Sequence, residues 1–401
     1  MQPYPDDTFS SRQSICHATM TIFTNAQLVL ADEVVRGSVH VDAGHIRSLD
    51  AGSSSLPGAI DLEGDYLWPG MVEVHTDNFE RHLMPRPAVR WDDASALLAH
   101  DAEIAASGIT TVLDALGVGE ADPDSVRGSE WDSVLAHIGE FSQRDLLRAQ
   151  HFLHVRCELP APNTLSLFAP FKDNPLVRMV SLMDHTPGQR QWENIGHAWI
   201  YFSGKKGWSQ AKFDARVAQA KEDQTRYAQP HRAYFAAYCK AHGITLASHD
   251  DTTVAHVEQA RAEGASVSEF PTTVAAAQAA RAHGMVTVMG GPNVVRGGSH
   301  SGNVSAIELA RQGLMDVLSS DYVPGSLLSA ALRLTEVAGL NLPQAVALVT
   351  RNPARCVGLP DRGEIAPGLR ADLIRVRILR LADGRKQGVV RAVWRGGVRV
   401  A

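Results

Sequence analysis

The sequence has few cysteines, and their spacing excludes two kinds of protein. The four cysteines are Cys16, Cys157, Cys239 and Cys356, and no two of them form a Cys-x-x-Cys pair. A disulfide-stabilised secreted scaffold and a cysteine-based zinc site are therefore both excluded. A reducing cytoplasm is the expected location.

The chain also lacks long apolar runs and an excess of basic residues. No stretch approaches the roughly 18 apolar residues that span a membrane, and the polar start, residues 1–19, lacks the order of a signal peptide. We expect these first residues to be a disordered tail. The net charge is −6, which excludes general binding of nucleic acid, so any anion must be bound by a local group of arginines and lysines.

Both ends of the chain have sequence patterns that are typical of a small β domain. Residues 20–68 contain short strands with loosely alternating apolar positions, and residues 361–401 contain a turn-rich stretch followed by β-branched runs. Each piece is small for an independent core. We therefore expect the two ends to pair into one small β-sandwich domain.

Between these ends, residues 69–360 alternate apolar strand candidates with helical segments. The candidates are Met71–His75, Thr110–Ala115, Phe152–Leu159, Val177–Asp184, Thr245–His249, Val267–Phe270, Val286–Gly290 and Val317–Asp321. Eight β-then-α units predict an α/β protein with a (β/α)8, TIM-like barrel. A long charged segment, about 190–237, is interpreted as a helical insertion after the fourth strand that could act as a lid.

Histidines and carboxylates recur at the carboxyl ends of these strand candidates, where barrels of this kind place catalytic groups. His75 and Asp77 are two residues apart, so in an extended chain they point to one side. Each histidine alone is more often structural, but their recurrence predicts a metal site. Asp114, Glu269 and the pair Asp250–Asp251 also follow strands and are left outside the ligand set. The predicted ligands are His75, Asp77, Glu158, His185, His249 and Asp321.

The donor types in this set indicate the kind of metal. Nitrogen and oxygen donors without sulfur suit Zn²⁺ or Mn²⁺. Six ligands are too many for one catalytic ion that also binds water, and they suit a pair of ions with a bridging carboxylate. Glu158 is our choice for the bridge, and its alternative is an ion pair with Arg156.

A second set of residues is predicted to bind phosphate. The loop Arg296-Gly-Gly-Ser-His-Ser301 combines flexibility, a guanidinium, hydroxyls and an imidazole, and such loops can surround phosphate oxygens. For each cation the alternative is a solvated surface charge. The predicted set is Arg86, Arg156, Arg190, Lys205, Arg296, His300 and Ser301.

Several strings resemble one family. Pro69-Gly followed by His75-Thr-Asp77 resembles the first barrel strand of the amidohydrolase superfamily, although most members carry His-x-His there. Longer strings are similar to a diphosphatase family of the carbon–phosphorus lyase pathway, and the likeness runs from about Met20 to Val400. These strings include Arg156-Cys-Glu158, Ser181-Leu-Met-Asp-His185, Glu269-Phe-Pro-Thr-Thr273 and Asn293-Val-Val-Arg-Gly-Gly-Ser-His-Ser-Gly-Asn303.

The resemblance implies an activity and its cofactors. Members of that family cleave the 5-triphosphate of a ribose 1-methylphosphonate and release pyrophosphate, with a metal-activated water as nucleophile. By superfamily analogy Asp321 would take the proton from that water. The resemblance also implies a phosphorylated ribose substrate, and the two divalent ions indicated by the six ligands agree with it. Barrels of this superfamily often dimerise, so a homodimer is one expected state, although the sequence leaves the oligomeric state open. The alternatives are a hydrolase of cyclic amides or N-acyl groups, which leaves the arginines unexplained, and a barrel without chemistry.

Overall fold

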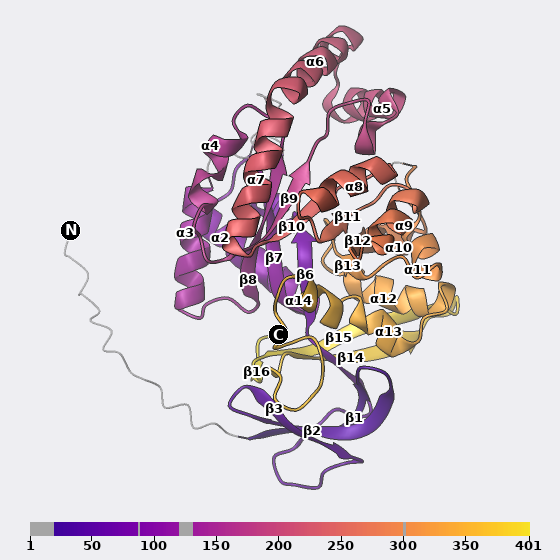
Figure 1. The fold of residues 1–401 in the computed structure, drawn as a ribbon. Helices are drawn as coiled ribbons and strands as arrows, with labels where there is room; N and C mark the ends of the chain where they lie inside the picture. The colour runs from indigo at the N-terminus through magenta and orange to yellow at the C-terminus, as the bar shows by residue number, and fades with distance from the viewer. Residues whose placement is uncertain (1–19, 87–88, 120–130, 300–301) are drawn as a thin grey trace, which may run out of the picture.

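The computed structural model describes residues 20–86, 89–119, 131–299 and 302–401. A barrel surrounded by helices forms the main body, and a sheet built from both ends of the chain lies beneath it (Figure 1). The predicted disordered tail, residues 1–19, lies outside the described residues.

Eight parallel strands form the barrel, in the order in which they follow one another along the chain. Every predicted strand overlaps one of them, so the predicted barrel is confirmed. Because parallel strands are covered on both faces, their sequences are continuous apolar runs rather than alternating ones. The strands are β6 (Met71–Thr76), β7 (Ile109–Val118), β8 (Gln150–Glu158), β9 (Val177–Met183), β10 (Thr245–His249), β11 (Val267–Glu269), β12 (Val286–Gly290) and β13 (Val317–Ser319).

A short seam between the first and last strands closes the barrel. Thr76 and Asp321 form an isolated parallel bridge, and the Asp321 amide donates to the carbonyl of His75 over 3.1 Å. Deeper in the seam, the buried Glu73 carboxylate accepts hydrogen bonds from the amides of His75 and Ser320, each at 2.6 Å. The seam therefore joins β6 and β13 at the end where the candidate ligands lie.

Helices cover the outside of the barrel. Several begin at a capping side chain that binds a free amide of the first turn, as Asp92 does for Ser95, and Thr253 for His256. The surrounding helices are α1 (Asn78–Leu83), α2 (Asp93–Ala106), α3 (Asp132–Gln143), α4 (Thr164–Phe168), α7 (Gln229–His242), α8 (Val254–Ala262), α9 (Val274–Ala282), α10 (Gly291–Arg296), α11 (Ala306–Arg311), α12 (Ser326–Val337), α13 (Leu342–Ala347) and α14 (Arg351–Cys356). Among the described residues, no helix has the length and apolarity needed to cross a membrane.

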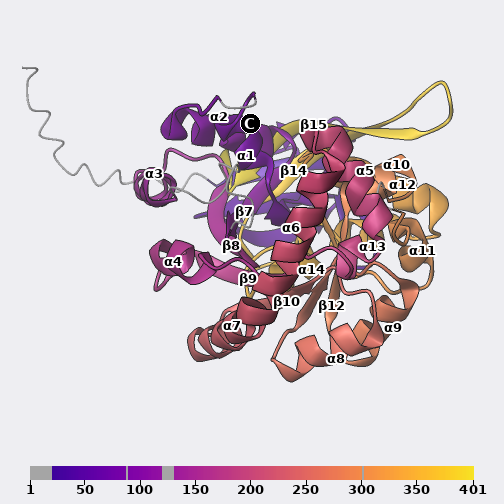
Figure 2. The same cartoon turned by 90° about the horizontal axis from the view of Figure 1, so that it is seen from above.

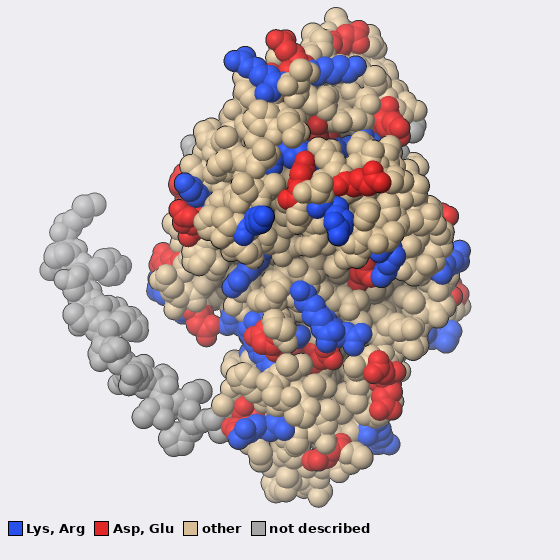
Figure 3. Space-filling view, viewed as in Figure 1, with Lys and Arg blue, Asp and Glu red and all other residues tan. Residues whose placement is uncertain are grey.

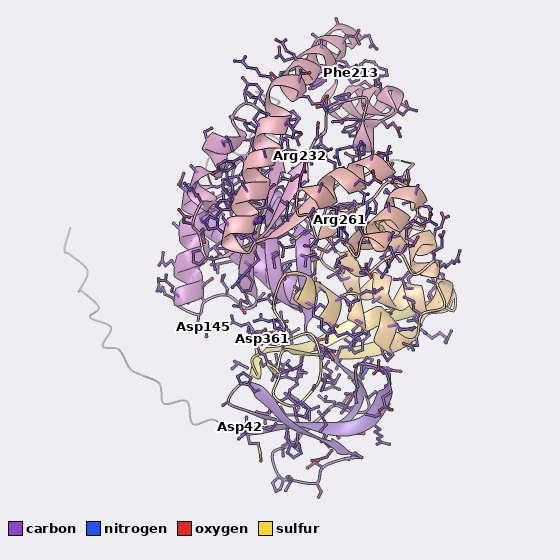
Figure 4. All side chains as sticks on the ribbon, viewed as in Figure 1. Asp42, Asp145, Phe213, Arg232, Arg261 and Asp361 are labelled. Carbon is purple, nitrogen blue, oxygen red and sulfur yellow. The ribbon has the colours of Figure 1, made fainter. Side chains whose placement is uncertain are left out.

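The segment between β9 and β10 is helical and lies over the barrel. It comprises a 3-10 turn η2 (Arg190–Trp192), α5 (Ile195–Lys206), α6 (Gln210–Asp223) and a π-helical turn η3 (Gln224–Ala228) that continues into α7. Figure 2 shows α6 crossing above the barrel, and Phe213 marks its position at the far end of the molecule from Asp42 (Figure 4). A small core of its own, built around Trp192, Ala198 and Phe213, stabilises this segment.

The two ends of the chain meet in a single sheet. β14 pairs antiparallel with β5, and this pairing joins the strands of the two ends, as predicted. What the sequence predicted as a small sandwich is thus one hydrogen-bonded sheet with its own core, in which Phe23 contacts Trp394 edge-on. Its strands are β1 (Thr21–Val29), β2 (Val34–Asp42), β3 (His45–Ala51), β4 (Ile60–Asp61), β5 (Tyr66–Pro69), β14 (Leu373–Arg380), β15 (Lys386–Arg395) and β16 (Val398–Arg399).

Candidate metal centre

A pocket of about 950 Å³ opens at the carboxyl end of the barrel strands. The polar groups of its floor come from residues at the ends of β6, β8, β9 and β10, and from Asp321 beyond β13. All six predicted ligands line this pocket: His75, Asp77, Glu158, His185, His249 and Asp321. The structure therefore brings together side chains that are widely separated in the sequence.

Three side chains at the ends of β9 and β10 form a compact group of donors. His185, His249 and Asp250 each offer one ligand atom, and these atoms lie within 4.8 Å of one another. One oxygen of Asp250 lies 3.4 Å from Nε2 of His249 and 3.8 Å from Nε2 of His185. Asp250 is thus a further candidate ligand, which the sequence places directly after His249 but which the predicted set omits.

Glu158, the predicted bridge, is bound by His185. Its Oε1 accepts from the His185 amide at 2.9 Å, and its Oε2 lies 2.5 Å from His185 Nδ1. Burial opposes ionisation of Glu158, but the charge and hydrogen bonds of His185 outweigh it and lower the pKa of the carboxyl. The bridging role of Glu158 stays a prediction.

Glu269, at the end of β11, supports two of the predicted ligands from below. Its Oε1 lies 3.0 Å from Nδ1 of His75, and its Oε2 lies 3.3 Å from Nδ1 of His249. A carboxylate at one ring nitrogen orients the imidazole and leaves the other nitrogen for an ion. Glu269 is therefore positioned to orient both rings.

His154 is a fully buried residue in edge-on contact with the ring of His75, and the sequence interpretation missed it. Its Nδ1 donates to the carbonyl of Val74 over 2.9 Å. Its Nε2 lies 3.8 Å from Glu269 and makes no hydrogen bond with the described residues. The available signal was the spacing, since His154, Arg156 and Glu158 alternate along β8 and share its inner face.

The pKa values of two predicted histidine ligands fit a divalent cation, whereas the negative charges of Glu158 and Asp250 outweigh burial and raise the pKa of the third, His185. Burial lowers the pKa of His75 well below its usual value and that of His249 to about 3, so both rings are neutral, as metal-binding imidazoles must be. Burial raises the pKa of Asp321 to about 7, to which the charge of Asp77 adds, and burial raises that of Asp250 to about 6. A cation bound beside these buried acids would stabilise their ionised forms. Nitrogen and oxygen donors without sulfur suit Zn²⁺ or Mn²⁺.

The backbone is unusual at the same strand ends. Asp250, Phe270 and Asp321 directly follow β10 and β11 or lie just beyond β13, and they have φ angles of 55°, 51° and 56°. Left-handed conformations are uncommon for residues other than glycine, and they concentrate at functional sites. The chain thus turns sharply where the candidate ligands are presented.

Two predicted phosphate-binding arginines line the pocket, Arg156 and Arg296. Arg156 Nη1 lies 3.7 Å from Asp77 Oδ2. Its Nε is buried and has no hydrogen-bond partner in the described part of the chain. Arg216 of α6 also lines the pocket, although the sequence did not single it out.

The structure places other members of the predicted cationic set elsewhere. Arg190 is 4% exposed and donates to the His249 carbonyl and to Asp251 Oδ1, each at 2.8 Å. It therefore fixes the end of β10 and is not among the residues that line the pocket, and its phosphate-binding role stays a prediction. Arg86 is exposed and is not among the pocket-lining residues. His300, Ser301 and the side chain of Lys205 lie outside what the structure describes.

Comparison with known proteins identifies the family. Residues 209–401 match the sequence pattern of the amidohydrolase family. The chain is 47% identical over 386 residues to the alpha-D-ribose 1-methylphosphonate 5-triphosphate diphosphatase of Escherichia coli (strain K12), covering 94% of this chain and 100% of that protein. The chain belongs to the amidohydrolase family.

Solved structures show the same amidohydrolase fold at lower identity. N-acetyl-D-glucosamine-6-phosphate deacetylase from Mycobacterium smegmatis is 17% identical with a TM-score of 0.60, over 95% of this chain and 100% of that one. Molinate hydrolase is 14% identical with a TM-score of 0.61, over 95% and 94% of the two chains. The similarity to these two structures shows the fold of this chain, the barrel together with its sheet, and nothing about the substrate.

Proposed function

We propose that this amidohydrolase cleaves α-D-ribose 1-methylphosphonate 5-triphosphate to the 5-phosphate and pyrophosphate, within phosphonate catabolism. The observation that carries the proposal is the 47% identity to the Escherichia coli diphosphatase over that protein's whole length. The pocket supports it, because histidines, clustered carboxylates and arginines meet there, as a metal-dependent reaction of a polyanion requires.

The chain's own residues divide into three roles. His75, Asp77, Glu158, His185, His249 and Asp321 would hold two divalent ions, Zn²⁺ or Mn²⁺, with Asp250 as an additional candidate. When bound, a divalent ion lowers the pKa of water and neutralises phosphoryl charge. Asp321 accepts the proton of the attacking water, a task suited to a carboxyl whose pKa burial raises to about 7.

Arg156 and Arg296 bind the phosphate oxygens. Phosphoryl transfer depends on positioning and on neutralising charge more than on covalent help from the protein. A triphosphate carries several negative charges, and both guanidinium groups line the pocket that contains the candidate ligands. They are the feature that a hydrolase of cyclic amides or N-acyl groups would not need.

A product assay tests the proposal. Purified protein with Mn²⁺ or Zn²⁺ is expected to release pyrophosphate from the ribose 5-triphosphate phosphonate, and metal content is measured on the same sample. Release of orthophosphate alone, or turnover of amides in preference to the triphosphate, would contradict the proposal. Asp321→Asn is expected to lower kcat by about 10²–10⁴-fold, as loss of a general base does, with an unchanged melting temperature. A cytoplasmic location and a homodimer stay predictions, and sedimentation tests the second.

A further inference from the structure

One wall of the metal pocket is aromatic, although its floor is highly charged. The insertion supplies this wall through Phe202 at α5, Trp208 between the helices, and Phe213 and Val217 on α6. The rings of Phe202 and Trp208 are stacked, with centroids 4.7 Å apart and planes 12° apart. Both side chains are only partly buried, so part of their surface is available to a bound molecule.

A triphosphate does not account for such a wall. Phosphate oxygens are bound by cations and N–H groups, and an aromatic face offers them nothing. Aromatic surface in a pocket instead contacts apolar parts of a ligand and removes them from water. The wall therefore indicates a part of the substrate other than the triphosphate.

A cation stands on the same helical face as the apolar wall. Arg216 follows Phe213 by three residues and precedes Val217, and residues at such spacing lie on one side of a helix. All three line the pocket. The wall thus combines a guanidinium with apolar surface, and this combination matches an organophosphonate, whose phosphorus bears both anionic oxygens and a carbon substituent.

We propose that the α5–α6 wall is the subsite for the phosphonate at C1 of the substrate. Arg216 binds the phosphonate oxygens, and Phe202 and Trp208 contact the carbon group on phosphorus. This assignment rests on the proposed function and leaves the metal ligands to the triphosphate at the other end of the substrate. The pocket, at about 950 Å³, is near the upper end of the roughly 300–1,000 Å³ of ligand pockets. Because the partly exposed rings of Phe202 and Trp208 line it, the proposal extends to phosphonates whose carbon group is larger and more apolar than methyl.

The test compares ribose 5-triphosphates that carry a methylphosphonate or a benzylphosphonate at C1. The unchanged enzyme is expected to release pyrophosphate from the benzyl compound with a kcat/KM at least equal to that for methyl. Trp208→Ala is expected to lower the benzyl-to-methyl ratio of kcat/KM by about tenfold, the usual effect of losing an apolar contact. Metal content is measured in every variant and is expected to stay constant.

The chain offers a matched control for this tryptophan. Trp199 packs against Phe213 with ring centroids 5.3 Å apart, in the same small core, but it is not among the residues that line the pocket. Trp199→Ala is expected to lower the melting temperature without changing the benzyl-to-methyl ratio. A ratio that is unchanged in Trp208→Ala, or that changes equally in Trp199→Ala, would overturn the proposal.

Arg216→Ala tests the anionic part of the subsite. Its KM is expected to rise about tenfold for both phosphonates and to stay unchanged for ribose 5-triphosphate without a C1 phosphonate. An equal rise for all three would refute the role of Arg216. If no substrate yields pyrophosphate, the proposed function fails, and calorimetric binding of the 1-benzyl- and 1-methylphosphonate 5-phosphates to the same variants still decides the subsite.

Discussion

The Oε1 atom of Glu269 lies 3.0 Å from Nδ1 of His75, and both side chains are buried. The second oxygen of the same carboxylate lies 3.3 Å from Nδ1 of His249. One acidic residue thus orients two proposed metal ligands that come from opposite parts of the chain. The spacing of residues along β6 or β10 does not predict this arrangement.

Glu269→Gln is expected to weaken binding of the divalent ion by about 10–100-fold, because an amide orients two imidazoles less firmly than a carboxylate does. Competition with a chelating dye measures the affinity directly and does not depend on activity. Glu308→Gln, at an exposed position of α11, is the control and is expected to bind metal normally. An unchanged affinity in Glu269→Gln would show that the carboxylate has no orienting role.

The sequence interpretation assigned phosphate binding to both Arg156 and Arg86. The variants Arg156→Ala and Arg86→Ala test these two assignments. Arg156 lines the pocket, whereas Arg86 is exposed and is not among its lining residues. Steady-state kinetics is expected to show a KM raised about 10-fold or more in Arg156→Ala, because a charge-assisted hydrogen bond is lost. Arg86→Ala is expected to keep the KM of the unchanged enzyme, and a raised value would restore the sequence-based role of Arg86.

The barrel strands could be predicted from the sequence because each is a short apolar run that ends at a polar residue. The side chains that directly follow such a run must lie at the carboxyl end of the barrel. For that reason His75, Asp77 and Asp321 could be grouped before any coordinates were known. The same argument applied equally to Asp250 and Glu269, and the choice among carboxylates at the strand ends could not be made from spacing.

Other roles depend on contacts between distant residues, which the sequence does not reveal. Arg190 carries a positive charge that suggested anion binding, but its guanidinium donates a hydrogen bond to Asp251. Asp114 follows the pattern of a strand-end carboxylate, yet it binds His100 and His151 between the barrel and α2. In both cases a buried side chain is bound by a partner from another element, and the spacing of residues along the chain does not predict that partner.

Glu73→Leu is expected to destabilise the barrel at its seam. The buried Glu73 carboxylate accepts hydrogen bonds from the amides of His75 and Ser320. A leucine leaves both amides without an acceptor, and each unsatisfied buried donor costs about 1–3 kcal/mol. Urea unfolding is expected to show a free energy of unfolding lower by about 2–6 kcal/mol.

Glu73→Gln is the conservative comparison for the seam. Its amide oxygen can still accept one hydrogen bond, so its loss of stability is expected to be smaller than that of Glu73→Leu. Burial also raises the pKa of Glu73 to about 7, which means that ionisation of this carboxyl opposes folding and that neutral glutamine avoids this cost. Equal stability of Glu73→Leu and the unchanged chain would show that the seam does not depend on these two hydrogen bonds.

His151 lies between two buried aspartates, and its charge makes stability depend on pH. Its Nδ1 is 2.8 Å from Asp114 Oδ2, and its Nε2 is 3.3 Å from Asp101 Oδ1. Burial opposes the charged ring, but the two carboxylates outweigh burial and raise the pKa of His151 to about 9. A histidine whose pKa is higher in the folded state stabilises fully below about pH 6.5, its unfolded value. This contribution is lost as the pH rises through about 9.

The expected result is a free energy of unfolding that falls by on the order of 3 kcal/mol between about pH 6.5 and 9.5. Urea unfolding at a series of pH values measures it. His100, 2.8 Å from the other oxygen of Asp114, has a pKa that burial lowers, so it stays neutral over this range and adds no slope. His151→Gln is expected to remove the part of the fall that His151 causes and to leave the part above about pH 8.5 that comes from three thiols whose pKa burial raises, those of Cys157, Cys239 and Cys356. His283→Gln, at an exposed position, is expected to keep both parts. A His151→Gln profile parallel to that of the unchanged chain would assign the fall to another group, because only the ring between Asp101 and Asp114 is changed in that variant.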